Sequence, residues 1–292
     1  MIVGAWVWAG GSYTSASTTG YIAAFGPANS TRAWRYPASD SEYIGAVAST
    51  PAVFTDGSNK RVVFGSMDGK VYCLRVFAES PYPAGSLVWS YQTLDSTSGP
   101  GKILASPVVY AGRVYIGNES ATVYCLNAGA SSTAGECFWS QTFARDGDWP
   151  DRTGVSSVAI GQTSTGETRA YVGCDNGHVY CLSLADSPSQ RVLWDYAGGD
   201  GSGIACVESS PTIYAGNVYV GTSWFGTSGE LEIYRQEERG RQRHYHNHHG
   251  SRHLRRGHRQ YPGGGSRRQD CAPCSAYWCP GYYDLAEVVH RL

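Results

Sequence analysis

Hydrophobic and polar residues alternate with a period of two in three stretches of the chain that resemble one another. They read RVVFGSMDGKVYCL from Arg61, RVYIGNESATVYCL from Arg113 and RAYVGCDNGHVYCL from Arg169. Period two is typical of β-strands, because successive side chains of a strand point to opposite faces. Each stretch therefore predicts two short strands joined by a tight turn, where glycine supplies the positive φ that such turns need.

Recurring segments on both sides of these stretches extend the pattern to four strands. A small-residue strand start precedes each stretch (ASTPAVFTDG, ASPVVYAG and VSSVAIG), and an aromatic cluster follows each one (SLVWSY, ECFWSQ and RVLWDY). A fourth copy runs from Ser209 to Tyr234, and a degenerate copy opens the chain. The glycine that ends the second strand marks the period, with spacings of 48 to 56 residues; these are Gly10, Gly65, Gly117, Gly173 and Gly221.

A four-stranded antiparallel unit of this length is typical of a β-propeller blade. A single blade cannot bury both of its faces, so neighbouring blades must stack. Complete blades are predicted at roughly Ala48–Tyr91, Ala105–Trp139 and Val155–Tyr196, with partial blades before and after them. We therefore expect an all-β fold, in which residues 1–234 form about four to five blades of an incomplete propeller ring and residues 235–292 form a disordered tail.

A tryptophan recurs at the predicted fourth strand of successive units. These residues are Trp34, Trp89, Trp139 and Trp194. A tryptophan buries roughly 150–250 Å², enough to hold one blade against the next. Stacking on a ligand is the alternative role, but recurrence in every unit favours packing.

These residues and spacings resemble the pyrroloquinoline-quinone (PQQ)-like propeller repeat. That repeat runs from a small-small-Pro strand through V-Y-V-G and D-G-x-V-Y-A-L to a final L-W, and GSMDGKVYCL with LVW fits it closely. The resemblance covers Ala5 to Tyr234. WD40 and kelch repeats fit less well, because their G-H, W-D and paired-glycine marks are missing. The resemblance implies an eight-bladed ring, of which this chain shows three full units and two partial ones.

The family has two branches, and the resemblance implies a different function for each. Quinoprotein dehydrogenases bind PQQ and Ca²⁺ in a central funnel, and many of them carry adjacent cysteines, which this sequence lacks. BamB-like members are non-catalytic. A few polar residues precede the first strands, and we expect them to be solvated loop charges because they form no recurring set; they are Asp95, Lys102, Asp148, Asp151, Arg152 and Asp200.

Three cysteines occupy the same strand position in successive units, namely Cys73, Cys125 and Cys181. Equivalent positions one blade apart are expected to be too far apart for a disulfide, which needs a Cα separation of about 4.4–6.8 Å. We therefore predict free thiols that fill small slots in the strands, as free cysteine behaves as a small hydrophobic residue. Cys137, Cys174 and Cys206 show no metal-ligand spacing.

Charge is distributed unevenly along the chain, although the formal net charge is only −1. The segment beyond Tyr234 holds 11 of the 23 basic residues, all arginine, and seven of the eight histidines. The part before it is mildly acidic, with 12 basic and 19 acidic residues. The charge asymmetry therefore belongs to the tail and requires a separate explanation.

Three hypotheses compete for the tail, Arg235–Leu292. A zinc site would use the histidines from His244 to His249 and the C-x-x-C of Cys271 and Cys274, but a second ligand pair at zinc spacing is missing. The second hypothesis is an arginine-rich arm that binds the phosphates of a nucleic acid or another anionic surface. The third is a change of reading frame near Tyr234, because the +1 frame permits APAISGGAIANTLVVGRDGKIVLLVL, another blade in register. We favour the third hypothesis.

The sequence thus predicts a non-catalytic propeller scaffold that presents loops and strand edges to a protein partner. The alternatives are a fragment of a PQQ-dependent alcohol or sugar dehydrogenase and a carbohydrate- or polymer-binding propeller. We assign no catalytic, cofactor-binding or metal residue and no cofactor, with PQQ and Ca²⁺ expected only for the dehydrogenase. No nucleic acid, membrane span or signal peptide is expected, and the family resemblance implies the periplasm or cell envelope.

Overall fold

The computed structural model describes most of the repeat region and little of the tail. The described residues are 2–8, 18–26, 31–95, 99–143, 154–197, 207, 209–224, 228–235 and 243–245. The chain divides into two units, Met1–His246 and Asn247–Leu292, and every described residue belongs to the first. Within the described residues, no helix is long and apolar enough to span a membrane.

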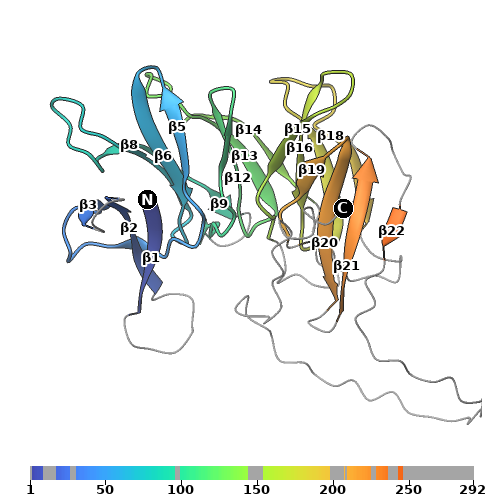
Figure 1. Cartoon of the computed structure of the whole chain (residues 1–292), viewed down its shortest axis with the longest axis horizontal. Coiled ribbons are helices and arrows are strands. Elements are labelled where there is room, and N and C mark those ends of the chain that lie inside the picture. The colour runs from blue at the N-terminus through green and yellow to red at the C-terminus, as the bar shows by residue number, and fades with distance from the viewer. Residues whose placement is uncertain are drawn as a thin grey trace, which may run out of the picture. The chain divides into compact units, whose positions relative to one another are not determined.

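A four-stranded sheet forms at each of the three complete repeats that the sequence predicts, and these sheets follow one another along the chain (Figure 1). In each sheet the strands are antiparallel and lie in chain order. The second sheet has β5 (Ala52–Asp56), β6 (Asn59–Gly65), β7 (Lys70–Arg75) and β8 (Leu87–Gln92). The third has β11 (Val108–Tyr110), β12 (Arg113–Gly117), β13 (Thr122–Asn127) and β14 (Cys137–Thr142), and the fourth has β15 (Ala159–Gln162), β16 (Thr168–Gly173), β17 (His178–Ser183) and β18 (Val192–Ala197).

The first sheet holds the strands equivalent to the second, third and fourth of a blade. It contains β1 (Ile2–Trp8), β2 (Thr18–Phe25) and β3 (Arg32–Tyr36), and the short β4 (Ile44–Gly45) also pairs with β2. Ala24 pairs with Trp34 just before a register shift, as Cys73 pairs with Trp89 in the second sheet. This match aligns β2 with β7, the third strand of the second sheet. A separate two-stranded pair, β9 (Leu94–Asp95) and β10 (Gly99–Pro100), precedes the third sheet.

The fifth sheet differs from the sequence expectation, which left it without a fourth strand. It contains β19 (Thr212–Tyr214), β20 (Asn217–Trp224), β21 (Ser228–Arg235) and the three-residue β22 (Arg243–Tyr245), which pairs with β21. Strand pairing therefore continues past the expected boundary at Tyr234. The predicted disorder of 235–292 stays a prediction, because apart from Arg235 at the end of β21 and the three residues of β22 this segment lies outside the described residues.

Tight turns join the first and second strands of the blades. Ala111 and Gly112 both have positive φ, 49° and 75°, and Ala215 and Gly216 repeat this with 48° and 76°. Two successive positive φ values are the requirement of a type I′ hairpin turn, whose twist matches that of the flanking strands. The AG dipeptide of the repeat therefore acts as the predicted hairpin turn.

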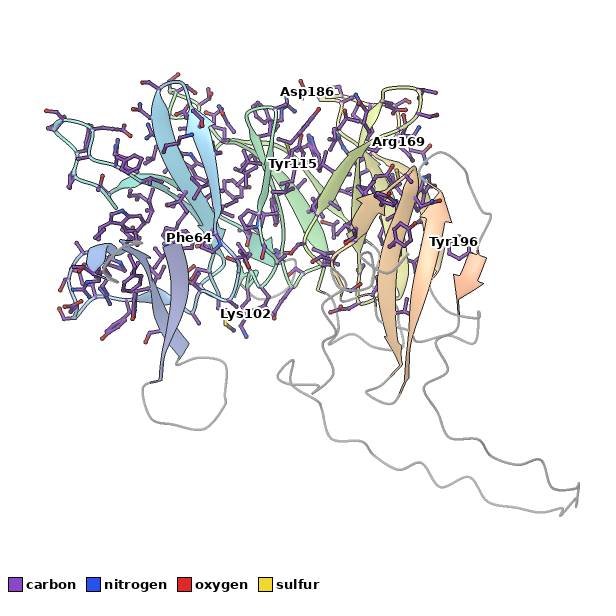
Figure 2. All side chains as sticks on the ribbon, in the orientation of Figure 1. Phe64, Lys102, Tyr115, Arg169, Asp186 and Tyr196 are labelled. Carbon is purple, nitrogen blue, oxygen red and sulfur yellow. The ribbon has the colours of Figure 1, made fainter. Side chains whose placement is uncertain are left out.

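The hydrophobic core is divided into layers, each of which lies between two consecutive sheets. Val63 and Val71 pack with Ile116 and Leu126 of the third sheet. Their neighbours in sequence, such as Phe64, pack in the other direction with the first sheet (Figure 2). The same arrangement recurs between the third and fourth sheets and between the fourth and fifth. Period two thus places alternate residues in alternate layers, so the central strands are buried on both faces, as stacked propeller blades require.

Candidate functional site

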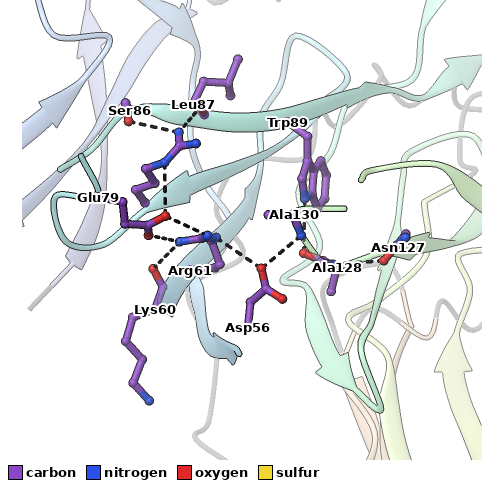
Figure 3. A network of polar contacts seen from close by, with 12 residues as sticks. Asp56, Lys60, Arg61, Glu79, Ser86, Leu87, Trp89, Asn127, Ala128 and Ala130 are labelled. Atoms are coloured by element: carbon purple, nitrogen blue, oxygen red, sulfur yellow. Dashed lines mark hydrogen bonds and ion pairs between the residues drawn. The ribbon is translucent and has the colours of Figure 1, made fainter. Parts of the chain in front are cut away.

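The tryptophans of the fourth strands lock consecutive blades together. The indole N–H of Trp34 donates to the carbonyl of Val76 at 3.0 Å, in the loop that follows the third strand of the next blade. Trp89 repeats this with the carbonyl of Ala128 at 3.3 Å (Figure 3). Each ring also covers a glycine of that loop, because a Cβ at Gly85 or Gly135 would lie 2.9 Å from the indole. Packing, as predicted, is the role of these side chains.

Trp139 makes the same junction with a different partner. The fourth blade has no glycine at the equivalent place, and the guanidinium of Arg191 lies 4.0 Å from the Trp139 ring centroid instead. Arg191 is held there by the carbonyls of Ser183 and Ala185, each 2.6 Å from its Nη1. A cation over an indole face is a favourable contact, so this junction replaces a packed glycine with an arginine.

The repeated cysteines are free thiols in the blade core, as predicted. Cys73, Cys125 and Cys181 are fully buried, and each pairs across the sheet with the tryptophan of its own blade. Burial raises the pKa of Cys125 to about 11 and that of Cys181 to about 12. The protonated thiol is not the nucleophilic form, so these side chains fill space in the core.

The small residues that start each blade also have structural roles. The Ser49 hydroxyl accepts from the N–H of Gly65 and donates to its carbonyl, both at 2.9 Å, and Ser209 clamps Gly221 in the same way. The following position links blades, because the Ser106 hydroxyl accepts from the N–H of Thr50 at 2.8 Å. The Ser157 hydroxyl in turn accepts from the N–H of Ser106 at 2.8 Å. The strand start therefore fixes the strand within its blade and ties adjacent blades together.

The anchor glycines allow the lead-in segment of the following blade to pass close to the sheet. A Cβ at Gly65 would lie 2.2 Å from a methyl group of Ile103, and one at Gly117 would lie 2.1 Å from a methyl group of Val155. The N–H of Ile103 also donates to the carbonyl of Ser66 at 3.2 Å. The recurring glycine is thus a point of contact between blades as well as the end of a strand.

The polar residues considered for a cofactor are only partly within the described residues. Lys102 lies in the lead-in segment of the third blade, where its carbonyl accepts from the N–H of Glu119 at 2.8 Å. Burial raises the pKa of Glu119, and the charge of Lys102 opposes that rise. Asp95 belongs to β9, and the others, Asp148, Asp151, Arg152 and Asp200, lie outside the described residues. Across the described ranges, no three His, Cys, Asp or Glu side chains form a metal-binding group.

Sequence reasoning missed a buried ionic network in the second blade (Figure 3). The Arg61 side chain is only 2% exposed and forms an ion pair with Glu79, whose Oε2 lies 3.0 Å from Nη2. Its Nε lies 3.6 Å from Asp56, and Asp56 accepts from the N–H of Ala130 in the next blade at 3.1 Å. An arginine in the second strand recurs in the aligned stretches, which was the available signal, but Glu79 lies in a loop that does not repeat and Asp56 lies at the end of β5.

The same network holds in place an exposed surface formed by the loop between β7 and β8 and by Leu87, the first residue of β8. Glu79 and Tyr82 exchange two backbone hydrogen bonds, and the Arg75 guanidinium lies 4.0 Å from the Tyr82 ring centroid. Arg75 also donates to the carbonyl of Leu87 at 2.7 Å. On this frame Phe77 is 65% exposed, Tyr82 52% and Leu87 38%. We call these three side chains the β7–β8 surface.

The equivalent loops of the next two blades provide an internal comparison. Residues 128–136 of the third blade and 184–191 of the fourth also receive a tryptophan from the preceding blade. They read AGASSTAGE and LADSPSQR and contain no aromatic residue. The contact between blades therefore does not require Phe77 or Tyr82. Exposed large apolar side chains gathered on one loop are typical of an interaction site.

Comparison with known proteins identifies the family of this repeat. The family model described as "Outer membrane protein assembly factor BamB" matches residues 3–194. The chain belongs to this BamB family. The match spans the first sheet to the last strand of the fourth, which is the region where the junctions between blades are described above.

Individual relatives of this BamB-family chain are distant. It is 30% identical over 139 residues to the "Beta-alanine-activating enzyme" of Danio rerio, a match that covers 44% of this chain and 10% of that protein. BamB from Moraxella catarrhalis is 15% identical with a TM-score of 0.47, over 74% of this chain and 56% of that one. Sqt1 of Saccharomyces cerevisiae is 8% identical with a TM-score of 0.52, over 77% and 55%. The chain thus spans about half the length of these two structures, and Sqt1 shows a likeness of fold alone.

Proposed function

We propose that this chain is a non-catalytic propeller scaffold that binds a protein partner through the β7–β8 surface. The observation that carries the proposal is that Phe77 and Tyr82, on the loop between β7 and β8, and Leu87, at the start of β8, are exposed on a segment held in place by Glu79 and Arg75. A rigid element that presents apolar side chains loses little conformational freedom on binding. The chain belongs to the family of the outer membrane protein assembly factor BamB, which is consistent with a role in protein association.

The charged side chains and thiols described above support this proposal, because they stabilise blades and the contacts between them. Arg61 forms ion pairs with Glu79 and Asp56 inside the second blade, and Arg75 also pairs with Glu79. Arg113 forms an ion pair with Asp186 of the next blade; Asp186 is labelled in Figure 2. The thiols of the repeat are buried beside tryptophans, where burial raises their pKa values. Among the described residues, these charged groups are therefore held in ion pairs within and between blades.

Two alternatives rest on other grounds. A fragment of a PQQ-dependent dehydrogenase is suggested by the repeat, and a europium-containing methanol dehydrogenase is similar over 52% of this chain and 25% of that one, at 18% identity and a TM-score of 0.37. A carbohydrate-binding propeller was suggested by aromatic content, but Trp89, Trp139 and Trp194 are buried between blades. A location in the periplasm or cell envelope follows from the family and belongs to the proposal.

Site-specific photo-crosslinking tests the scaffold function. The full chain would carry benzoylphenylalanine at position 77, with a control at position 214, where Tyr214 is equally exposed on another blade. The proposal expects a discrete protein adduct from position 77 only. No adduct, or the same adduct from both positions, would contradict it. Titration with PQQ and Ca²⁺, followed by the quinone spectrum and by alcohol oxidation, addresses the alternative: tight binding with turnover would favour the dehydrogenase.

A further inference from the structure

We infer that the β7–β8 surface takes a short, extended, proline-containing segment of the partner that carries no charged side chain. The inference rests on the proposed scaffold function and specifies the chemistry of the partner. It follows from three properties of the loop: its internal charge balance, its small size and the type of side chain exposed.

The charges of the loop are already satisfied within the molecule. Glu79 is the one acidic residue between β7 and β8, and it pairs with Arg61 and with Arg75, whose Nε lies 3.5 Å from its Oε2. The exposed positions of the loop are otherwise apolar or uncharged, and they include Pro81 and Pro83. A charged partner would lose hydration here without gaining a counter-charge. The complementary segment is therefore uncharged.

The size of the surface favours a short segment over a folded domain. A stable interface between two domains buries about 800 Å² and some 20–30 residues on each side, whereas this surface presents three large side chains on one loop. A short flexible segment would lose much conformational entropy on binding. A proline-rich segment loses less, because it is already extended as a polyproline II helix.

Exposed aromatic rings are the groups on which such segments dock. The Tyr82 ring has the Arg75 guanidinium on one side and is still 52% exposed, and Phe77 is 65% exposed. Arg75 is fixed by Glu79 and by the carbonyl of Leu87, so the Tyr82 ring is held before a partner arrives. These two exposed rings, together with the exposed side chain of Leu87 at the start of β8, offer apolar contacts for proline rings without requiring hydrogen bonds from the segment.

The test uses the full chain and fluorescein-labelled decaproline, with a glycine-serine peptide of equal length as the flexible uncharged control. Fluorescence anisotropy should show weak saturable binding of decaproline and none of the control peptide. The variants F77S and Y82S should each weaken binding about tenfold, which corresponds to the loss of about 1.4 kcal/mol of apolar contact. Tyr214→Ser, which removes an exposed aromatic ring on the fifth sheet, should change it less than about twofold. Raising the salt concentration from about 0.15 M to about 1 M shortens the screening length from ~8 to ~3 Å and should change binding little.

Several outcomes would overturn the inference. The inference fails if the parent protein does not bind decaproline, or if F77S and Y82S bind it as tightly as the parent does. It also fails if binding depends strongly on salt concentration. Binding of neutral phosphatidylcholine vesicles through Phe77 and Tyr82, in place of the peptide, would likewise overturn it. The crosslinking experiment at position 77 separates this failure from that of the scaffold function. A protein adduct without decaproline binding would leave the scaffold standing and refute the proline-containing partner.

Discussion

Replacing Trp89 with alanine should disrupt one junction between blades without touching the exposed surfaces. The side chain is 6% exposed, packs on Gly135 of the next blade and donates a hydrogen bond to the carbonyl of Ala128. Truncation of a buried tryptophan costs about 3–5 kcal/mol, because it removes apolar contacts and leaves a cavity. Trp89→Phe keeps most of the ring but loses the N–H, so about 1–2 kcal/mol is expected from the lost hydrogen bond and the smaller ring.

Urea unfolding followed by circular dichroism measures this effect. With a slope of about 2–3 kcal/mol per molar urea, Trp89→Ala should lower the midpoint by roughly 1–2 M. Tyr214→Ala, which removes an exposed ring, should stay within about 0.5 kcal/mol of the parent. A loss below about 1 kcal/mol for Trp89→Ala, or one equal to that of Tyr214→Ala, would refute the blade-locking role.

A double-mutant cycle tests the contact itself. Alanine at Gly135 places a methyl group 2.9 Å from the Trp89 ring and at a φ of 73°, so it should be destabilising in the parent protein. In the Trp89→Ala background the clash disappears and only the backbone strain of about 1–2 kcal/mol remains. The two substitutions should therefore be clearly non-additive. Additive effects would show that the ring and the glycine are not in contact.

Four further predictions concern the buried ion pair, the serine clamp, a buried thiol and the reading frame after Tyr234. Glu79→Gln should lower the free energy of unfolding by about 3 kcal/mol in urea titrations, because it leaves the buried Arg61 guanidinium with a weaker partner; a change below about 1 kcal/mol would contradict this. Ser49→Ala should lower it by about 1–2 kcal/mol, since the clamped glycine loses a buried hydrogen-bond partner, and an unchanged urea midpoint would argue against the clamp. Burial raises the pKa of Cys125 to about 11 from 9.0, so iodoacetamide should modify it only after unfolding, and the free energy of unfolding should fall as pH rises from about 9 toward 11 because the unfolded thiol ionises first; native labelling at neutral pH, detected by mass spectrometry, would disprove this. Finally, the +1 frame of the coding DNA after the codon for Tyr234 should encode a further blade, and stop codons there would end that hypothesis.

Much of the fold could be predicted because the repeat appears several times in one sequence. Period-two alternation with tight turns at Gly112 and its equivalents defines four strands, and the recurrence of Trp89 at the last strand indicates packing between blades. The fifth sheet shows the limit of this approach. β22 was not predicted, because three residues without the tryptophan pattern give no local signal and pair only when β21 offers an edge.

The candidate site was less accessible to sequence reasoning. Recurrence identifies residues with a common structural role, whereas the β7–β8 surface is distinctive because it does not recur. The loop sequence FAESPYPAGSL gives no indication that Glu79 turns inward to Arg61 while Phe77 and Tyr82 remain exposed. That outcome depends on contacts between strands and loops about 20 residues apart in the chain, which only folding brings together.

The sequence by itself determined the blade, its four strands, its turns and the residues that pack it, because each of these depends on local alternation or on a residue type repeated at a fixed spacing. The tertiary structure decided which neighbours those residues meet: Trp89 with Gly135, Ser106 with Ser157 and Asp56 with Ala130. It also decided which side chains of a loop are neutralised inside and which face solvent. The physical reason is that burial and ion pairing depend on distances between separate blades, and a linear pattern does not contain those distances.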